Sequence, residues 1–237
     1  MDCLYIVVPA YNEEPNLRNF VDDWYPVVER HNPEGTSRLV ILDDGSTDDT
    51  CRLLREMART RPLLVPLTKE NEGHGPTVIR GYRYALKHQA DYIFQTDSDG
   101  QTDPEEFDDF WSQRKDYAAL FGNRVARGDG KAREFSEKVL CFILRLIFHV
   151  SIPDSNAPFR LMSRRFLKKY IRKLPRKYFL PNVMLTTFGV YYHEPVRFIP
   201  ISFRPRQGGT NSINMKKMVR IGIRSVREFL WFRRNRM

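Results

Sequence analysis

The sequence has few cysteines, and their spacing excludes two common uses of this residue. Cys3, Cys51 and Cys141 are the three present in 237 residues. Their odd number and wide separation predict neither a disulfide framework nor a metal cluster, so we expect free, mostly buried thiols in a reducing compartment. The chain also lacks internal repeats, low-complexity tracts and a clear linker, which argues against two independent domains.

Long apolar runs are missing as well. No stretch approaches the roughly 20 residues that a membrane-spanning helix needs. The longest, residues 139–152, contains Arg145 and His149. A secretory signal peptide is not expected either, because Asp2 and Pro9 interrupt the start and no apolar segment follows a basic one.

The residues that are present are those of a folded domain with an uneven charge. Hydrophobic residues make up 41% of the chain and aromatic residues 13%, which excludes intrinsic disorder. The net charge of +10 divides into −10 over residues 1–123 and +20 over residues 124–237. An acidic half that could hold a metal thus precedes a basic half that would attract phosphates, anionic membranes or nucleic acid.

Apolar runs and helical patterns alternate along the first half of the chain. The runs that predict buried strands are residues 4–8, 38–42, 63–67, 92–95 and 118–121; the segments with helical spacing are residues 13–30, 46–59, 75–89 and 105–114. This alternation predicts a mostly parallel sheet with helices on both faces. In the second half we expect a helix at 134–148, a polar turn at 154–160, a basic helix at 166–174, an edge strand at 196–203, a loop at 204–214 and a basic helix at 213–237.

Polar residues follow four of the predicted strands at their carboxyl ends. They are Tyr11-Asn12-Glu13, Asp43-Asp44, Asn71-Glu72-Gly73 and Asp97-Ser98-Asp99. Because ligands bind parallel sheets at this edge, four converging polar loops predict a nucleotide-type site. Asp97 and Asp99 are one residue apart on an extended chain and can face the same space, where their oxygens suit Mg²⁺ or Mn²⁺. The alternative is an ordinary polar turn.

The order and spacing of the motifs resemble those of family 2 glycosyltransferases with the GT-A fold. The motifs, spread over residues 4–212, are Val8-Pro9-Ala10-Tyr11-Asn12-Glu13, Asp43-Asp44-Gly45-Ser46, Asn71-Glu72-Gly73-His74-Gly75, Asp97-Ser98-Asp99-Gly100-Gln101, Asp154-Ser155-Asn156-Ala157-Pro158-Phe159-Arg160 and Arg206-Gln207-Gly208-Gly209. Within the family the chain is similar to polyprenyl-phosphate glycosyltransferases such as dolichyl-phosphate mannose synthase. The resemblance implies an α/β, GT-A-like three-layer sandwich.

The same resemblance implies a domain plan and residue roles. A glycosyltransferase domain at 1–212, with a nucleotide-sugar-binding half (1–123) and an acceptor-binding half (124–212), precedes the amphipathic helix at 213–237. The implied nucleotide-sugar contacts are Pro9, Tyr11, Glu13, Asp43, Asp44, Gly73, His74, Asp97 and Ser98. The implied ligands of a divalent cation, Mg²⁺ or Mn²⁺, are Asp99 and Gln101. The residues implied to contact the acceptor phosphate or the donor diphosphate are Arg124, Arg160 and Arg206. The expected catalytic set is Asp99, Asp154 and Arg160. His74 departs from the family pattern, which often has lysine there.

The implied reaction moves a sugar from a UDP- or GDP-linked donor with inversion at the anomeric carbon. A polyprenyl phosphate acceptor, dolichyl or undecaprenyl, is already ionised and needs positive charges rather than a base. A hydroxyl of a growing glycan would need a base, for which Asp154 is the candidate. Remote alternatives are a haloacid-dehalogenase-like phosphatase, whose opening string Asp97-x-Asp99-Gly100 matches, and a non-catalytic module that binds anionic surfaces.

The last segment, residues 213–237, combines eight Lys and Arg with one acid. Basic amphipathic helices of this kind lie in the headgroup plane of a membrane. The alternative is a helix packed on the domain with a solvated basic face. We expect a cytoplasmic protein of cell-envelope glycan synthesis, peripheral on the cytoplasmic face of a membrane, with a membrane partner subunit as an option and without a nucleic-acid partner.

Overall fold

Seven strands form one sheet in the order β3-β2-β1-β4-β6-β5-β7 in the computed structural model, which describes residues 2–127, 130–205 and 215–237. The strands are β1 (Leu4–Ala10), β2 (Arg38–Asp43), β3 (Leu64–Thr68), β4 (Tyr92–Thr96), β5 (Ala119–Arg127), β6 (Phe159–Ser163) and β7 (Val196–Phe203). Neighbouring strands are parallel except that β6 runs antiparallel to β4 and β5. The predicted mostly parallel α/β sheet is confirmed.

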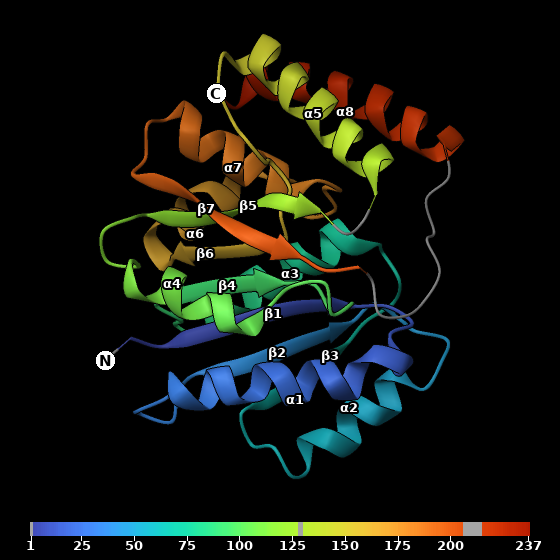
Figure 1. The fold of residues 1–237 in the computed structure, drawn as a ribbon, viewed down its shortest axis with the longest axis vertical. Helices are drawn as coiled ribbons and strands as arrows, with labels where there is room; N and C mark the ends of the chain where they lie inside the picture. Colours follow the sequence, from blue (N-terminus) through green and yellow to red (C-terminus); the bar gives the residue numbers. More distant parts are fainter. Residues whose placement is uncertain (1, 128–129, 206–214) are drawn as a thin grey trace.

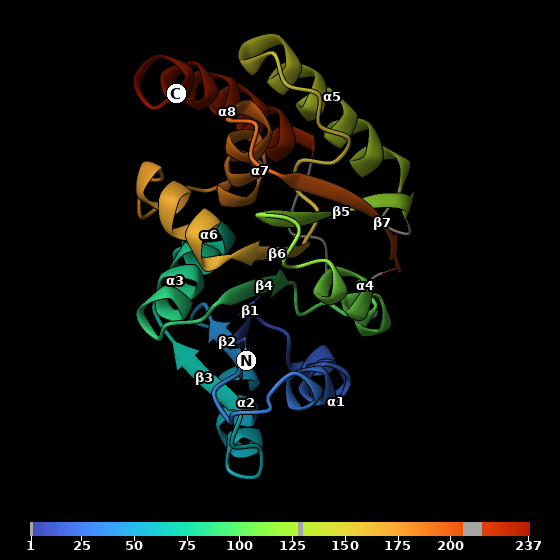
Figure 2. The same cartoon turned by 90° about the vertical axis from the view of Figure 1, so that its left-hand side faces the viewer.

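Helices cover both faces of this sheet. They are α1 (Glu14–Arg30), α2 (Thr50–Ala58), α3 (His74–Lys87), α4 (Phe107–Ser112), α5 (Lys131–Phe148), α6 (Arg164–Tyr170), α7 (Pro181–Tyr191) and α8 (Met215–Asn235), with short 3₁₀ turns at Pro104–Glu106 and Ile171–Lys173. Figures 1 and 2 show α1, α2 and α4 on one face and α3, α6 and α7 on the other. Helices α5 and α8 pack together beyond α7, at the top of Figure 1.

The side chains of β1 alternate between two hydrophobic cores. Ile6 faces the core that contains Trp24 of α1, and Val7 faces the core that contains Tyr82 of α3. Burial on both faces explains why this strand reads as a continuous apolar run in the sequence. At Gly81 the helix α3 comes so close to β1 that an added Cβ would lie 2.3 Å from Val7 Cγ1, so only glycine fits there.

Two elements are not predicted by the sequence patterns. Residues 181–189 of α7 are all buried, so this helix has no polar face and no amphipathic period to detect. Strand β6 begins at Phe159, inside the segment expected to be a polar turn. The turn therefore ends at Pro158, and the expectation is wrong for Phe159 and Arg160.

Helix α8 packs on the rest of the protein through one face. Ser225, Phe229 and Phe232 are buried there, and the ring of Phe229 contacts that of Phe148 at the end of α5. The packed-helix alternative therefore holds for this face of α8. Among the residues that the structure describes, no helix is long and apolar enough to cross a membrane.

The three cysteines are free, as predicted. The expectation that they are mostly buried is wrong, because each is only partly shielded from solvent.

Candidate active site at the carboxyl edge of the sheet

The loop after β1 begins the site. The carbonyl of Pro9 accepts a hydrogen bond from Ser98 Oγ at 3.0 Å, which joins this strand end to the loop after β4. Tyr11 is 46% exposed and open to a ligand. Glu13 is buried at the start of α1, where its Oε2 accepts from Asn16 Nδ2 at 2.7 Å.

Asp44, after β2, organises the next loop. Its carboxylate accepts from Lys69 Nζ and from the amides of Glu72 (3.0 Å) and Gly73 (2.9 Å). These contacts hold the backbone at Gly73, whose φ of 93° favours glycine, directly before α3. Asp44 thus supports the loop on which the next functional side chain, His74, is carried.

One carboxylate oxygen of Asp43 has no hydrogen-bond partner among the residues that the structure describes. Asp43 Oδ1 accepts from the amide of Ser46 at 2.9 Å. Its Oδ2 is buried and has no hydrogen-bond partner within the described ranges. An unsatisfied buried carboxylate oxygen is costly, so this oxygen is suited to accept a hydrogen bond from a ligand.

His74 contacts the acidic loop after β4. Its Nε2 lies 3.1 Å from Asp97 Oδ1. Burial lowers the pKa of His74, but the carboxylates of Asp97, Asp99 and Asp44 outweigh it and raise the pKa from its ordinary value. Since 52% of the side chain is open to solvent, the neighbouring charges decide the direction.

The loop after β4 holds the two aspartates in different ways. Asp97 Oδ1 also accepts from Gln95 Nε2 at 2.9 Å. Asp99 Oδ1 accepts from the amide of Gln101 at 3.3 Å. The side chain of Gln101 is buried, and its Nε2 donates to the carbonyl of Arg204 at 2.9 Å, just beyond β7.

The donor atoms of this loop fit one kind of cation site. No group of three or more His, Cys, Asp or Glu side chains is placed to hold a metal in the part of the chain that the structure describes. Mg²⁺ and Mn²⁺ commonly use one or two carboxylates and take further oxygens from water and substrate phosphates. The carboxylates of Asp97 and Asp99 fit that chemistry, whereas a cage made only of protein ligands is not present among the described residues.

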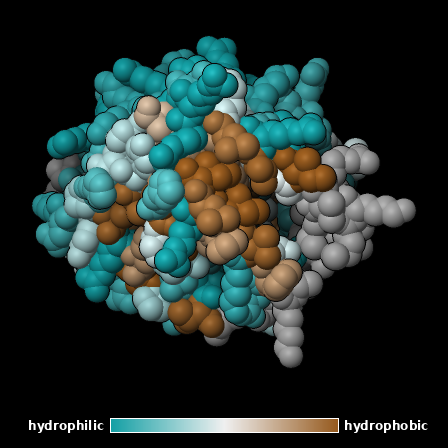
Figure 3. Space-filling model, turned by 90° about the horizontal axis from the view of Figure 1, so that it is seen from above, coloured by the Kyte–Doolittle hydropathy of each residue, from teal (hydrophilic) through white to brown (hydrophobic). Residues whose placement is uncertain are grey.

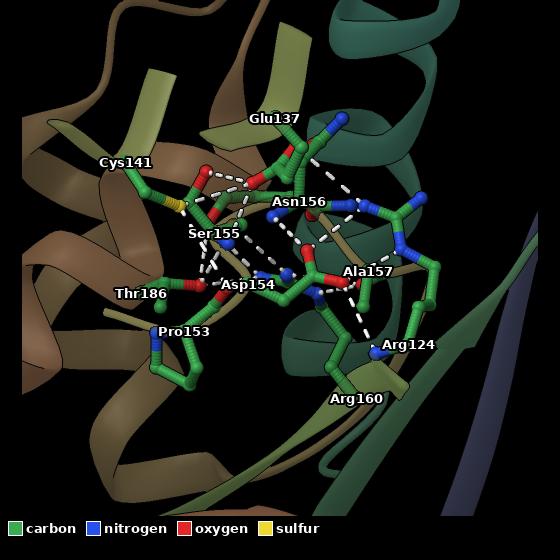
Figure 4. A network of polar contacts seen from close by, with 11 residues as sticks. Arg124, Glu137, Cys141, Pro153, Asp154, Ser155, Asn156, Ala157, Arg160 and Thr186 are labelled. Carbon is green, nitrogen blue, oxygen red and sulfur yellow. Dashed lines mark hydrogen bonds and ion pairs between the residues drawn. The ribbon is translucent and has the colours of Figure 1, made fainter. Parts of the chain in front are cut away.

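Arg124 and Asp154 form a buried ion pair (Figure 4). Arg124 Nε and Nη2 donate to the two oxygens of Asp154 at 2.7 and 2.8 Å, and the amide of Arg124 donates at 3.2 Å. Burial raises the pKa of the Asp154 carboxyl, but these bonds outweigh it and hold the pKa below its ordinary value. Asp154 is therefore a weak base in this arrangement.

Arg160 is completely buried beside this pair (Figure 4). Its guanidinium donates to the carbonyls of Ser155 (3.4 Å), Ala157 (3.2 and 3.1 Å) and Asn182 (3.0 Å) and to Thr186 Oγ1 (3.3 Å). These bonds use all five N–H groups of the side chain. A direct contact between Arg160 and a phosphate would require these acceptors to be replaced, so in this structure Arg160 supports the loop at 154–157 and α7.

A buried amide pair connects the two halves of the site. Gln95, which donates to Asp97, accepts from Asn182 Nδ2 at 2.8 Å, and Asn182 Oδ1 accepts from Tyr82 Oη at 2.9 Å. The carbonyl of Asn182 is a partner of Arg160. Sequence reasoning missed Gln95 and Asn182, since glutamine and asparagine 87 residues apart carry no local signal of their pairing.

The structure therefore brings the predicted residues into two linked groups. Strand-end loops unite Pro9, Asp43, His74, Asp97 and Ser98, and the buried network unites Arg124, Asp154 and Arg160. Arg206, the third predicted arginine, lies outside the described residues. The acidic loops lie at the carboxyl edge of the α/β sheet, which is where sheets of this class bind nucleotides and other ligands.

Comparison with known proteins narrows this class. Residues 5–171 match the model of glycosyl transferase family 2, and the chain belongs to that family. It is 25% identical to a dolichyl-phosphate beta-glucosyltransferase from Trichomonas vaginalis, over 96% of this chain and 71% of the relative. It is 23% identical to an undecaprenyl-phosphate 4-deoxy-4-formamido-L-arabinose transferase from Pseudomonas fluorescens, over 92% of this chain and 62% of the relative.

A solved structure shows the same fold. The glucosyl-3-phosphoglycerate synthase of Mycobacterium tuberculosis, in complex with Mn²⁺, UDP-glucose and glycerol 3-phosphate, superposes with a TM-score of 0.69. The match covers 98% of this chain and 80% of that chain at 19% identity, and it confirms the GT-A-like architecture. The phosphatase alternative is wrong, because the chain is a glycosyltransferase and Asp97 follows β4 rather than a first strand.

Proposed function

We propose that this glycosyltransferase moves a sugar from a nucleotide diphosphate sugar to a polyprenyl phosphate, with inversion at the anomeric carbon. The relatives from Trichomonas vaginalis and Pseudomonas fluorescens are named for transfer to dolichyl phosphate and undecaprenyl phosphate, which supports this acceptor class. The observation that carries the choice of acceptor is the bidentate contact of Arg124 with Asp154.

A hydroxyl acceptor needs a general base with a pKa near the working pH. Asp154, the candidate for that role, has both oxygens engaged by Arg124 and a pKa below its ordinary value. A phosphate acceptor is ionised already and needs no base. The contact therefore supports the phosphate acceptor over the sugar hydroxyl.

In the proposed reaction, an oxygen of the lipid phosphate attacks the anomeric carbon. The bond from that carbon to the diphosphate breaks on the opposite face, and the nucleoside diphosphate leaves with the electron pair. Asp43 Oδ2, which has no partner within the described ranges, accepts a hydrogen bond from the base or ribose beside Tyr11. Asp99, with Gln101 as the second proposed ligand, would hold a divalent cation, which would supply positive charge to offset the negative charge of the leaving diphosphate.

The supporting residues fix the positions of the side chains that are proposed to contact the substrates. Gln95 and His74 fix the carboxylate of Asp97 beside the donor. Arg160 and Asn182 hold the loop at 154–157, and Asp154 of this loop fixes the side chain of Arg124. Arg124 is proposed to contact a phosphate on the basis of its motif position. Arg206 is proposed to contact a phosphate on the basis of its motif alone.

The proposed acceptor is a membrane lipid, so we also propose peripheral binding on the cytoplasmic face of a membrane, directly or through a membrane partner subunit. Transfer is tested with labelled UDP- and GDP-sugars, Mn²⁺ and a polyprenyl phosphate. We expect organic-extractable label with one donor. The unphosphorylated polyprenol is the matched control and should accept none. Label that appears only in water-soluble glycan would support the hydroxyl alternative and overturn the proposal.

A further inference from the structure

Helix α5 is apolar on two sides. Leu144 and Phe148 are buried against the protein. On the opposite side four large apolar residues are exposed: Phe135 (69%), Val139 (40%), Phe142 (59%) and Leu146 (60%). Their spacing of four, three and four residues puts them on one stripe of the helix. Exposure of a continuous apolar stripe in water is unfavourable and marks an interaction site.

The neighbouring helix α8 extends this apolar surface. Ile223 (54%), Leu230 (53%) and Trp231 (45%) are exposed on it. Figure 3, which views the end of the molecule formed by α5 and α8, shows hydrophobic residues gathered in the middle of that surface with hydrophilic residues around them. We call the exposed apolar residues of the two helices the α5–α8 face.

The exposed charges around the α5–α8 face are mainly basic, and two of them, Lys138 and Arg224, are paired with Glu134 and Glu228 of their own helices. Among the side chains of α5 and α8 that the structure describes, the exposed charged residues are all basic: Lys138, Arg145, Arg224, Arg227 and Arg234. The acidic residues of the two helices, Glu134, Glu137 and Glu228, are less exposed. An apolar stripe with cations beside it matches an anionic bilayer, in which acyl chains lie beneath negative headgroups.

We propose that the α5–α8 face inserts into the headgroup region of an anionic bilayer and that α5 supplies most of the apolar contact. The sequence pattern points to residues 213–237 for this role, whereas the larger exposed stripe belongs to α5. This proposal depends on the proposed function in one respect: the proposed lipid acceptor lies in a membrane. A protein partner is the competing occupant of this face, and the test below separates the two.

The test is sedimentation of the full chain with acceptor-free vesicles of phosphatidylcholine, alone or with about one third phosphatidylglycerol. We expect binding to the anionic vesicles, weakened by salt, and little to the neutral ones. Phe142→Asp and Leu146→Asp should each weaken binding about tenfold or more, because each exchanges an inserted apolar group for a charge. Ser112→Asp on α4 adds the same charge on another surface and should bind like the unchanged protein.

Each outcome bears on the proposal separately from catalysis. Thermal unfolding checks that all variants fold, and transfer to a water-soluble short-chain isoprenyl phosphate should be the same for Phe142→Asp and the unchanged protein. Vesicle binding that Phe142→Asp and Leu146→Asp leave intact would overturn the proposal. Failure to bind vesicles, with self-association that Phe142→Asp abolishes, would assign the face to a second copy instead. Loss of soluble transfer in every form would contradict the proposed function alone.

Discussion

Asp99 lies at the end of the carboxylate pair after β4, and its Oδ1 accepts from the Gln101 amide. Asp99→Asn keeps the size of the side chain but removes the negative charge that a cation needs. We expect the transfer rate to fall by about 10³ or more, with the unfolding temperature changed by less than about 2 °C. Asp116→Asn, at an exposed carboxylate elsewhere, is the control. A rate within about tenfold of the unchanged protein would contradict the role of Asp99.

Arg160 is predicted to act mainly through position. Arg160→Lys keeps the charge but loses the planar fork, so several of the carbonyls at Ser155, Ala157 and Asn182 lose their donors. We expect the free energy of unfolding to fall by about 3–5 kcal/mol, as when a buried charge network is broken. Urea unfolding measures it, with Arg59→Lys on the surface as the matched control. A loss equal to that of the control would show that the network contributes no stability.

Asp154 should make stability depend on pH. Its pKa is lower in the folded than in the unfolded state, so its ionised form stabilises the fold above the ordinary carboxyl pKa. That contribution is lost as the pH falls through the folded-state pKa. The stability difference between the unchanged protein and Asp154→Asn should therefore be large near pH 7 and shrink towards about pH 3. Denaturant unfolding at several pH values measures it, and exposed Glu105→Gln should show little difference. A stability difference between the unchanged protein and Asp154→Asn that grows as the pH falls would contradict this prediction.

At the scale of elements, burial decided which parts of the fold could be predicted. The apolar runs of the first half predict β1 to β4 closely. They predict only the first residues of β5, because this strand continues through Asn123 and Arg124 to Arg127. Helix α7 is buried all round and so has no amphipathic period. Asn182 on that helix, and its contact with Gln95, follow from tertiary packing that no local pattern contains.

The same limit applies to Arg160. An arginine in a polar string predicts contact with an anion, yet here its donors meet backbone carbonyls because β6 carries it into the interior. The number of acceptors around a buried guanidinium depends on how distant segments meet. Residue type therefore indicated that Arg160 matters and did not indicate what it touches.

Two neighbouring aromatic residues of α8 test how that helix is held. Phe232 is buried and contacts the rings of Tyr178 and Phe188, whereas Trp231 is 45% exposed on the α5–α8 face. We expect Phe232→Ala to lower the free energy of unfolding by about 3–5 kcal/mol. Trp231→Ala should lower it by less than about 1 kcal/mol while weakening vesicle binding. Equal losses of stability would mean that α8 does not pack as described.

Across the whole molecule, the uneven charge of the sequence has a spatial counterpart. The acidic first half supplies most of the strand-end loops, and the basic second half supplies α5 and α8 at one end of the molecule (Figure 1). The basic end would be drawn towards an anionic surface, while the acidic loops would repel a donor diphosphate unless cations compensate them. The acidic first half as a whole, like Asp97 and Asp99 at the site, therefore requires a cation before a diphosphate can bind.

The need for a cation predicts that the donor nucleotide and the cation together stabilise the whole fold. A donor nucleotide sugar at about 100 times its Kd, with Mn²⁺, should add about 2.7 kcal/mol to the free energy of unfolding and raise the unfolding temperature by several degrees. A chelator should remove most of this increase, because the repulsion between diphosphate and carboxylates returns. Comparison of UDP- with GDP-sugars by calorimetry identifies the base that the site accepts. Asp99→Asn should show little increase with either donor, and an increase that survives both the chelator and this substitution would exclude the cation from donor binding.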